Sequence, residues 1–268
     1  MSRMKAWRWN GETYETQDSI PVEDRGFRYG MALFESLRVW HGVPLFFKEH
    51  LELLLSACGD REFRIDEHSL FAAGELLRRA GTDGFARIYV TAGDGSVAAS
   101  ATHCRVVVTL EDREAPNLDP CSVAIPHEAH RPLFGGLKTA NYWANIDALQ
   151  RAMRDGKDDA LLFNDQAELI SACMANVFVV HRGTVRTPAL ACGARRGVIR
   201  EWVLNQITVK QGSLFVEDLQ TADEVFLTNS WFGFHPVGRI GSREIPSFEL
   251  CHQLSEAYNK ALAEMVRH

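Results

Sequence analysis

Apolar and polar positions alternate in two ways along the first part of the chain, and each way predicts a kind of element. Residues 32–40, 43–47, 85–93 and 103–112 are rich in Val, Phe and other β-favouring side chains, so we expect strands there. The dipeptide His41-Gly42 predicts a turn between the first two strands. Residues 47–60 and 67–81 carry apolar side chains at helical spacing. These two predicted helices stop at Gly59 and Gly81.

The second part of the chain begins with a helical pattern over residues 141–156. Trp143, Ile146, Leu149 and Met153 fall at helical spacing there, and Gly156 follows as a cap. Strands are then predicted over 159–164, 168–174, 176–183, 184–188 and 223–230, with a hairpin over 238–245. A helix is expected to begin at Gly197, and an amphipathic helix over 248–266 closes the pattern.

A polar segment with two prolines separates these two parts. We therefore predict an α+β protein of two domains. Residues 1–115 would form a small N-terminal α/β domain, 116–130 a linker, and 131–268 a larger, β-barrel-like domain with helices.

Composition narrows the range of functions. The 268 residues are 46% hydrophobic, which is enough for a large core, and the formal net charge is −6. Without a long basic run, the chain is a poor nucleic-acid binder. No apolar stretch approaches the roughly 18 residues of a membrane helix, and residues 1–15 do not resemble a secretory signal. Six scattered cysteines indicate reduced thiols and a cytoplasmic protein. The pair His127 and His130 lacks further ligands, so no metal site is expected.

Four local features could carry chemistry, and each has a structural alternative. Lys138 lies between two glycines and an aromatic pair; a desolvated lysine can attack a carbonyl, or it can simply cover a neighbouring ring. The helix start at Gly197 offers free N–H groups to a phosphate, as any helix start does. Thr228 ends a strand and could bind phosphate or carboxylate, or merely finish the strand. Asn176, between two apolar runs, is equally a structural amide or a binding residue.

These features occur together, in a recognisable order. The segments "DRGFRYGMALFESLRV", "LKTANYWANIDALQRAMRDGKDDALLFN", "ELISACMANVFVVHRGTVRTPAL", "GARRGVIR" and "EVFLTNSWFGFHPV" resemble the class IV aminotransferase family. This family consists of fold-type IV pyridoxal 5'-phosphate (PLP) enzymes: branched-chain aminotransferases, D-amino-acid aminotransferases and 4-amino-4-deoxychorismate lyases. The resemblance extends from about residue 20 to residue 240. The spacing from Lys138 to Asn141 is closest to that of the lyase and D-amino-acid branches.

The resemblance implies a role for individual residues. Lys138 matches the Schiff-base lysine that holds PLP and later moves the proton at the substrate's α-carbon. The backbone at Gly197, Val198 and Ile199 matches the phosphate-binding helix start. Two further sets also follow from the family pattern: phosphate or cofactor contacts at Thr228 and Asn176, and contacts with an amino-acid-like substrate at Tyr29 and Arg38. Family members are usually homodimers, which is expected here.

Three positions depart from the family pattern. Ser171 stands where the family has a glutamate that contacts the ring nitrogen of PLP, and Glu168 would point from the opposite face of a strand. A hydroxyl cannot hold a proton on that nitrogen by charge. Leu53 stands where the family has a phosphate-binding arginine, so a contact of roughly 1.5–3 kcal/mol is missing. Met31 replaces a common aspartate.

The departures leave three functional hypotheses. A weaker electron sink should harm amino transfer more than elimination, so we favour a lyase resembling 4-amino-4-deoxychorismate lyase. The first alternative is an aminotransferase that moves an amino group between a small amino acid and a 2-oxo acid. The second is a non-catalytic relative with weak or no PLP binding, since contacts at Ser171 and Leu53 are lost.

Overall fold

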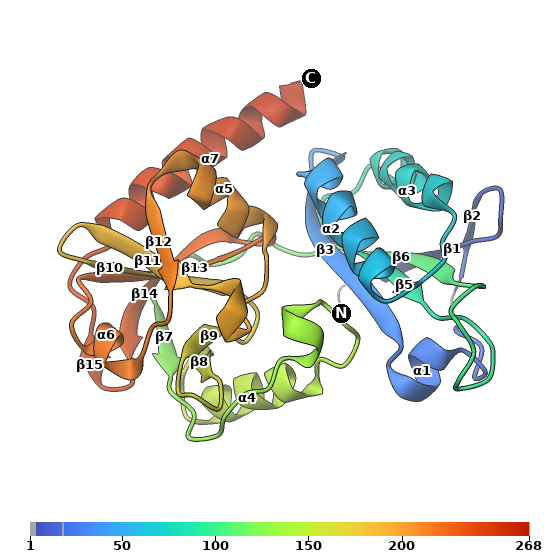
Figure 1. Cartoon of the computed structure of the whole chain (residues 1–268). Coiled ribbons are helices and arrows are strands. Elements are labelled where there is room, and N and C mark those ends of the chain that lie inside the picture. The colour runs from blue at the N-terminus through green and yellow to red at the C-terminus, as the bar shows by residue number, and fades with distance from the viewer. Residues whose placement is uncertain (1–3, 18, 268) are drawn as a thin grey trace. The chain divides into compact units, whose positions relative to one another are not determined.

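The computed structural model describes residues 4–17 and 19–267, and they group into two compact units (Figure 1). The first unit comprises residues 1–115, 138–141 and 262–268; the second comprises 116–137 and 142–261. Each unit combines an extensive sheet with separate helices, which confirms the α+β class. No helix of the described residues is long and apolar enough to cross a membrane.

The first unit is built on a six-stranded antiparallel sheet in the order β2-β1-β6-β5-β3-β4. Its strands are β1 (Met4–Trp9), β2 (Tyr14–Thr16), β3 (Ala32–Trp40), β4 (Val43–Pro44), β5 (Gly84–Thr91) and β6 (Arg105–Glu111). Its helices are α1 (Arg25–Tyr29), α2 (Phe47–Asp60) and α3 (Glu67–Ala80).

Side-chain alternation along β3 separates a core face from a polar face. Leu37 and Val39 are almost fully buried on the face that α2 and α3 cover. Glu35 lies on the same face and accepts a 2.9 Å hydrogen bond from His50 of α2. The predicted His41-Gly42 turn is confirmed by the β3–β4 pairing. The strand expected over 43–47 is wrong beyond Pro44, because Phe47 already begins α2.

The loop between β5 and β6 is fixed by one buried side chain. Arg25 of α1 is 1% exposed and donates hydrogen bonds to main-chain oxygens of this loop. The five acceptors are the carbonyls of Ala92, Gly93, Ser96, Ala99 and Ser100. This loop therefore has its conformation set through its backbone.

The second unit contains a nine-stranded mixed sheet in the order β12-β11-β10-β13-β14-β7-β8-β9, with β15 beside β14. Its strands are β7 (Cys121–Ala124), β8 (Asp159–Phe163), β9 (Leu169–Ala172), β10 (Asn176–His181), β11 (Thr184–Pro188), β12 (Val209–Gly212), β13 (Glu224–Asn229), β14 (Gly233–Ile240) and β15 (Arg243–Glu244). The segment 116–130, expected as a linker, contains β7. This strand lies in parallel between β14 and β8, so that part of the linker prediction is wrong.

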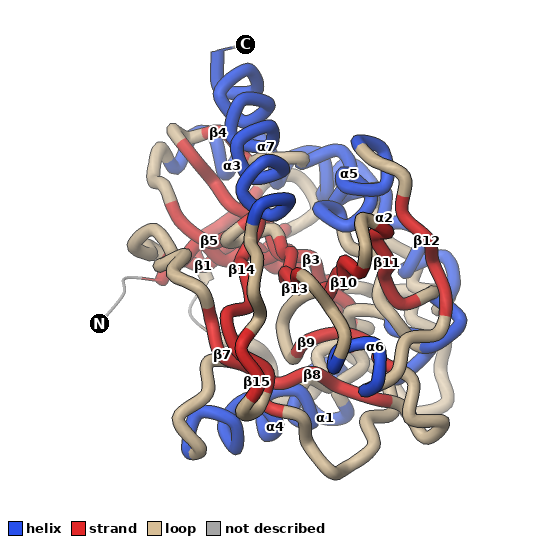
Figure 2. The backbone as a smooth tube through the Cα atoms, turned by 90° about the vertical axis from the view of Figure 1, so that its left-hand side faces the viewer, coloured by secondary structure: helices blue, strands red, loops and turns tan. Residues whose placement is uncertain are grey.

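This sheet curls around a core of its own. The ends of the sheet approach each other, because β9 lies beside β10 and β11 (Figure 2). Val177, Leu161, Val225 and Val237 are fully buried within one hydrophobic cluster inside the curl. The curled form agrees with the predicted β-barrel-like shape.

Four α-helices border this sheet: α4 (Trp143–Arg154), α5 (Val198–Gln206), α6 (Val216–Gln220) and α7 (Glu249–Arg267). The helix predicted over 141–156 is confirmed as α4, but its buried face differs from the expected one. Ala152 is 2% exposed, whereas Trp143 is 81% and Met153 is 63% exposed. Small side chains let α4 approach β8 closely, so two of the largest apolar residues fall on its outer side.

Candidate active site

Lys138 belongs to the first unit, where it extends the edge of β3. The Phe34 N–H donates a 3.0 Å hydrogen bond to the Lys138 carbonyl, and Ala140 N–H donates 2.9 Å to Ala32. Thr139 forms an isolated bridge with Leu33 between them. The lysine backbone is thus held by a short antiparallel pairing, which fixes the direction of its side chain.

The Lys138 amine lies over an aromatic surface. Its Nζ is 4.5 Å from the centre of the Phe34 ring, and this ring stacks on Tyr89 at 5.3 Å. Both Lys138 and Tyr89 are half-buried. Burial is the largest influence on Tyr89 and raises the pKa of its hydroxyl, which therefore stays protonated at neutral pH. The half-buried amine thus packs over a stacked pair of rings, and the phenol of Tyr89 lies next to its supporting ring.

The same face of this sheet carries two arginines. Arg38 lies two register positions beyond Phe34 on that face, and the β3–β5 register places Arg87 between Tyr89 and Phe85 on the neighbouring strand. Arg38 lies over Trp40 at 5.6 Å, and Arg87 lies over Phe85 at 4.6 Å. A row of guanidinium and aromatic groups suits an anionic substrate.

Arg87 and Tyr89 were not identified from the sequence. Their signal was the alternation of Phe85, Arg87 and Tyr89, three polar or aromatic side chains two residues apart. That alternation predicts a shared face. It could not predict that this face is the one that holds Lys138, because that depends on the register between β3 and β5.

Tyr29, the other proposed substrate contact, ends the short helix α1 and is 42% exposed. The following residue, Gly30, has φ +68 and forms the left-handed end of the helix. The Asn141 side chain donates 2.9 Å to the Gly30 carbonyl, and a Cβ at Gly30 would lie 2.2 Å from the Asn141 oxygen. Gly30 therefore permits a contact that joins the segment of Lys138 to α1.

The predicted phosphate residues lie in the second unit and converge at the start of α5. Gly197 is the N-cap of α5, and no side chain caps the helix there. The N–H groups of Val198 and Ile199 belong to its first turn, at the positive end of the helix dipole. Both residues are buried, so these donors are in a sheltered position.

Two polar side chains from neighbouring strands complete this group. Asn176 of β10 pairs with Thr228 of β13 in the sheet register. The Asn176 amide donates 2.8 Å to the Arg195 carbonyl, and a Cβ at Gly197 would lie 2.2 Å from its oxygen. Thr228 is 1% exposed, and its hydroxyl has no hydrogen-bond partner. We call Asn176, Gly197, Val198, Ile199 and Thr228 the phosphate cradle.

The chemistry of the cradle fits a phosphate group. Phosphate oxygens are strong acceptors, and the cradle offers backbone N–H groups, a helix dipole and one hydroxyl without a partner. A buried hydroxyl without a partner costs roughly 1–3 kcal/mol, which a bound phosphate would recover. The residues present are therefore those that would hold the phosphate of PLP.

Ser171 and Glu168 are also in the second unit. Ser171 is half-buried on β9, opposite Leu162 of β8. Glu168 precedes β9, and its carboxylate accepts hydrogen bonds from Ser213 and, at 2.8 Å, from Asn164. The bond from Ser213 is the main reason why the pKa of Glu168 is lowered. Glu168 is thus bound by Asn164 of its own loop and by Ser213 of the segment between β12 and α6.

Leu53 lies half-buried on α2 of the first unit. In the second unit, Arg200 is buried and bound to Glu201, Gln211 and the Pro188 carbonyl. Burial is the largest influence on Arg200 and lowers its pKa.

Among residues 4–17 and 19–267, no cluster of His, Cys, Asp and Glu is arranged to hold a metal ion.

Comparison with known proteins gives a consistent family. The amino-transferase class IV profile matches residues 32–240. The aminodeoxychorismate lyase of Bacillus subtilis is 26% identical and aligns with 96% of this chain and 94% of its own length. A D-alanine aminotransferase of Listeria monocytogenes is 26% identical, with 96% and 97% coverage. The crystal structure of 4-amino-4-deoxychorismate lyase from Pseudomonas aeruginosa superposes with a TM-score of 0.85 at 26% identity, covering 95% and 98%.

These matches favour an enzyme over the non-catalytic alternative, and enzymes of this family use PLP. The profile covers well over half of the sequence and includes Lys138, the phosphate cradle and the row of arginines. The chain belongs to the class IV aminotransferase family and is a PLP-dependent lyase or aminotransferase that acts on amino-acid substrates.

Proposed function

We propose that this enzyme is a lyase that removes a small leaving group from an amino-acid-like substrate, as aminodeoxychorismate lyase does. Ser171 is the observation that favours elimination over amino transfer. At the position where the family resemblance implies an acid, a hydroxyl can donate a hydrogen bond but cannot keep a ring nitrogen protonated. Elimination expels negative charge with the leaving group, so it depends less on the ring as an electron sink than amino transfer does.

We further propose that Lys138 is the covalent attachment point of PLP and that the phosphate cradle binds its phosphate. PLP, when bound, supplies an electron sink next to the amino-bearing carbon of the substrate. The amine of Lys138, supported by Phe34, would move the proton at that carbon. The Thr228 hydroxyl and the α5 N–H groups would hold the phosphate by donating hydrogen bonds.

Arg38, Arg87 and Tyr29 are the proposed substrate contacts. Two guanidinium groups on one sheet face support a substrate with more than one carboxylate. A 4-amino-4-deoxychorismate-like molecule, with one carboxylate on its ring and one on its enolpyruvyl group, satisfies this condition. A small monocarboxylic amino acid would leave one of the two arginines without a bound anion.

The lyase is tested by incubating the PLP-loaded enzyme with 4-amino-4-deoxychorismate and measuring pyruvate. We expect one pyruvate per substrate without any 2-oxo acid in the assay. The matched variant Ser171→Glu should gain amino-transfer activity relative to elimination. Strict dependence on a 2-oxo acid in the parent enzyme would instead establish the aminotransferase alternative.

The attachment point is tested separately by borohydride reduction and peptide mass mapping. We expect the cofactor mass on the peptide of Lys138. It should disappear in Lys138→Ala and persist in Lys48→Ala, which removes an exposed lysine of α2. An adduct on any other lysine would contradict the assignment.

Assembly and location are two further proposals. We propose a homodimer, supported by the usual assembly of the family, and light scattering of the purified protein would measure it. We also propose a cytoplasmic location. All six cysteines are free, and five of them are buried, as suits a reducing compartment.

A further inference from the structure

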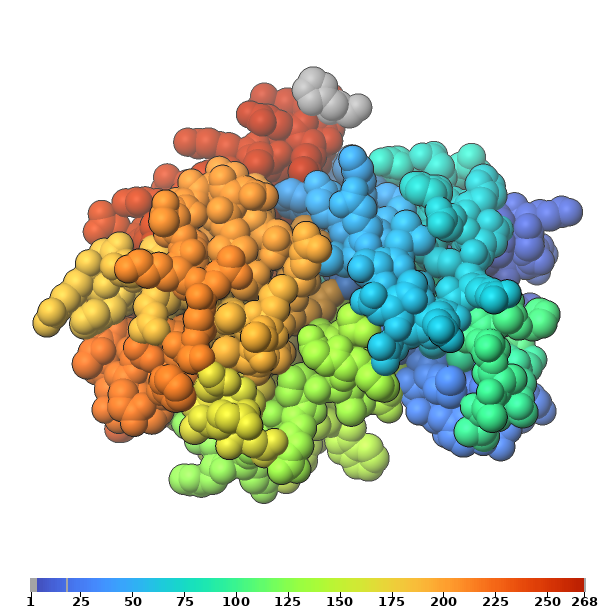
Figure 3. All heavy atoms as spheres, viewed as in Figure 1, coloured from blue at the N-terminus to red at the C-terminus, as the bar shows by residue number. Residues whose placement is uncertain are grey.

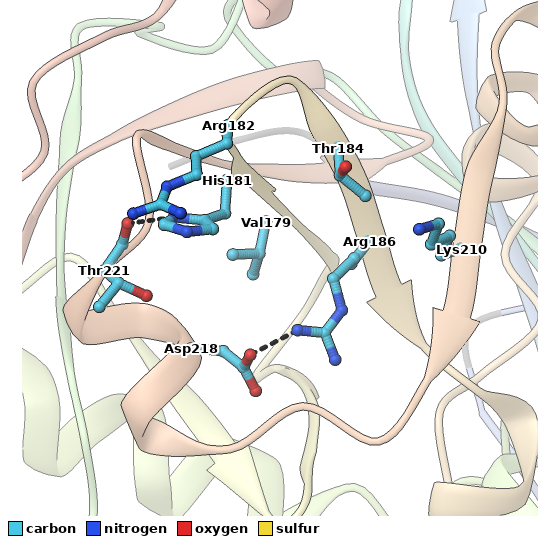
Figure 4. A pocket seen from close by; sticks show the side chains of 8 residues that line it. All are labelled: Val179, His181, Arg182, Thr184, Arg186, Lys210, Asp218 and Thr221. Atoms are coloured by element: carbon cyan, nitrogen blue, oxygen red, sulfur yellow. Dashed lines mark hydrogen bonds and ion pairs between the residues drawn. The ribbon is translucent and has the colours of Figure 1, made fainter.

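A pocket lined mainly by polar and charged residues lies in the second unit, at the other end of β10 from Asn176. It has a volume of about 410 Å³ and is lined by Val179, His181, Arg182, Thr184, Arg186, Lys210, Asp218 and Thr221 (Figure 4). His181 and Asn176 are the two ends of β10, so roughly 16 Å of strand separates them. We call this cavity the hairpin pocket. It shares no residue with the phosphate cradle.

The strand register explains why these side chains meet. Val179 pairs with Arg186 and His181 with Thr184, so the four side chains share one face of the β10–β11 hairpin. Lys210 on β12 pairs with Arg186 and continues that face. The hairpin reaches the surface of its unit, as its gold segment in Figure 3 shows.

The charge in the hairpin pocket is mostly positive. Asp218 is its single carboxylate, and Arg186 forms an ion pair with it. Asp218 also accepts a 2.8 Å hydrogen bond from the backbone of Phe215. Arg182 and Lys210 are exposed and form no ion pair with any described residue. The turn residue Arg182 and Lys210 of β12 are therefore two cations at the pocket that form no salt bridge with any described residue.

The backbone at Arg182 is unusual. Arg182 and Gly183 form a two-residue turn with φ values of +47 and +73, a conformation that favours asparagine and glycine. The N–H of Arg182 donates 2.5 Å to Asp223, and the ring of His181 donates 2.6 Å to the Thr221 carbonyl. These contacts hold an arginine in a left-handed position. A strained residue with its side chain at a pocket supports a functional role.

We propose that the hairpin pocket binds a small dianion, such as a dicarboxylate or a phosphate ester, between Arg182 and Lys210. Thr184 supplies a hydroxyl group for its remaining oxygens. Val179 lies between His181 and Arg186 and offers an apolar surface to a short carbon skeleton (Figure 4). The Nδ1 of His181 donates to the Thr221 carbonyl, which fixes the orientation of the ring beside the pocket.

The test is calorimetric titration of the PLP-loaded enzyme with malate, and separately with glycerol 3-phosphate, at constant ionic strength. Bound PLP occupies the phosphate cradle, and its absorbance reports any ligand at the cofactor. We expect saturable binding of at least one probe without a change in that absorbance. The malate and phosphate arms distinguish the two kinds of dianion.

The decisive variant is Arg182→Asn combined with Lys210→Gln. Affinity should fall at least tenfold. The control, Arg154→Asn with Lys260→Gln, removes the same charge from exposed positions outside the pocket and should bind within twofold of the parent. If the double variant folds poorly, Lys210→Gln alone should weaken binding about threefold. No binding by the parent, or equal weakening in the control, overturns the proposal.

Discussion

The two ends of β10 carry two proposed anion sites, and the donors at these sites differ. At Asn176 the donors are mainly backbone N–H groups of α5, and Gly197 is required for their geometry. At His181 the donors are long side chains, Arg182 and Lys210, on a surface turn and strand. Backbone donors are rigid and select a ligand of one shape. Flexible cationic side chains adapt to ligands of several shapes, and their affinity for anions falls as the salt concentration rises. One strand thus separates a proposed specific site for the cofactor phosphate from a proposed adaptable pocket.

The largest expected effect tests the rigidity of the cradle. In Gly197→Ala the new Cβ would lie 2.2 Å from the Asn176 oxygen, so Asn176 must give up its bond to Arg195. We expect PLP affinity to fall at least 100-fold, about 3 kcal/mol, in an absorbance titration. Gly212→Ala is the control, since a Cβ there meets nothing within 4 Å. PLP binding within threefold of the parent would show that the cradle is not rigid.

A second prediction concerns the hydroxyl without a partner. Thr228→Val should lower PLP affinity about tenfold but raise the free energy of unfolding of the PLP-free protein by about 1 kcal/mol. Thr187 is equally buried, but it donates 2.8 Å to the Val177 carbonyl. Thr187→Val should therefore destabilise by about 1 kcal/mol and leave PLP affinity unchanged. Denaturant unfolding and PLP titration measure both quantities. Destabilisation by Thr228→Val would contradict the assignment.

Salt concentration should change ligand affinity at the two ends of β10 to different extents, and the expected difference is smaller than in the first two predictions. Raising NaCl from about 50 to about 500 mM should weaken dianion binding at the hairpin pocket several-fold, because exposed cations are screened. PLP affinity should change less, since the cradle donors are buried backbone groups. Parallel titrations at the two salt concentrations measure the ratio. A steeper loss for PLP would reverse the comparison.

The smallest effect concerns the strained turn. Arg182→Asn places a residue that accepts a positive φ at the first turn position. We expect the free energy of unfolding to rise by roughly 0.5–1 kcal/mol, measured by denaturant titration. Arg154→Asn, at the end of α4, is the control and should give no such gain. A loss of stability in Arg182→Asn would mean that its guanidinium stabilises the hairpin.

Local sequence patterns predicted the helices, strands and turns better than they predicted which of these elements pair or pack together. The turn at His41-Gly42 and the helix start at Gly197 follow from the chain's own neighbours. The strand β7 was missed because it has four residues beside a proline-rich segment, and only its distant partners β14 and β8 make it a strand. The exposed Trp143 was missed for a related reason, because helical spacing does not reveal which neighbour a helix packs against.

The site shows the same division. Lys138, Asn176 and Thr228 were proposed from the family resemblance, which matches individual residues of the sequence. The pairing of Asn176 with Thr228, the unsatisfied hydroxyl and the row formed by Arg87 and Tyr89 depend on strand registers between distant segments. No local pattern fixes such registers.

The hydrogen bonds from Arg25 to the main chain of the β5–β6 loop suggest how new binding specificities could be engineered. Arg25 contacts the β5–β6 loop through main-chain oxygens, and residues 96–100 of this loop are all exposed. Their identity is therefore uncoupled from the folding of the loop. A combinatorial library at these positions, with Gly95 and Arg25 retained, would sample new surfaces on one constant scaffold, much as antibody loops do.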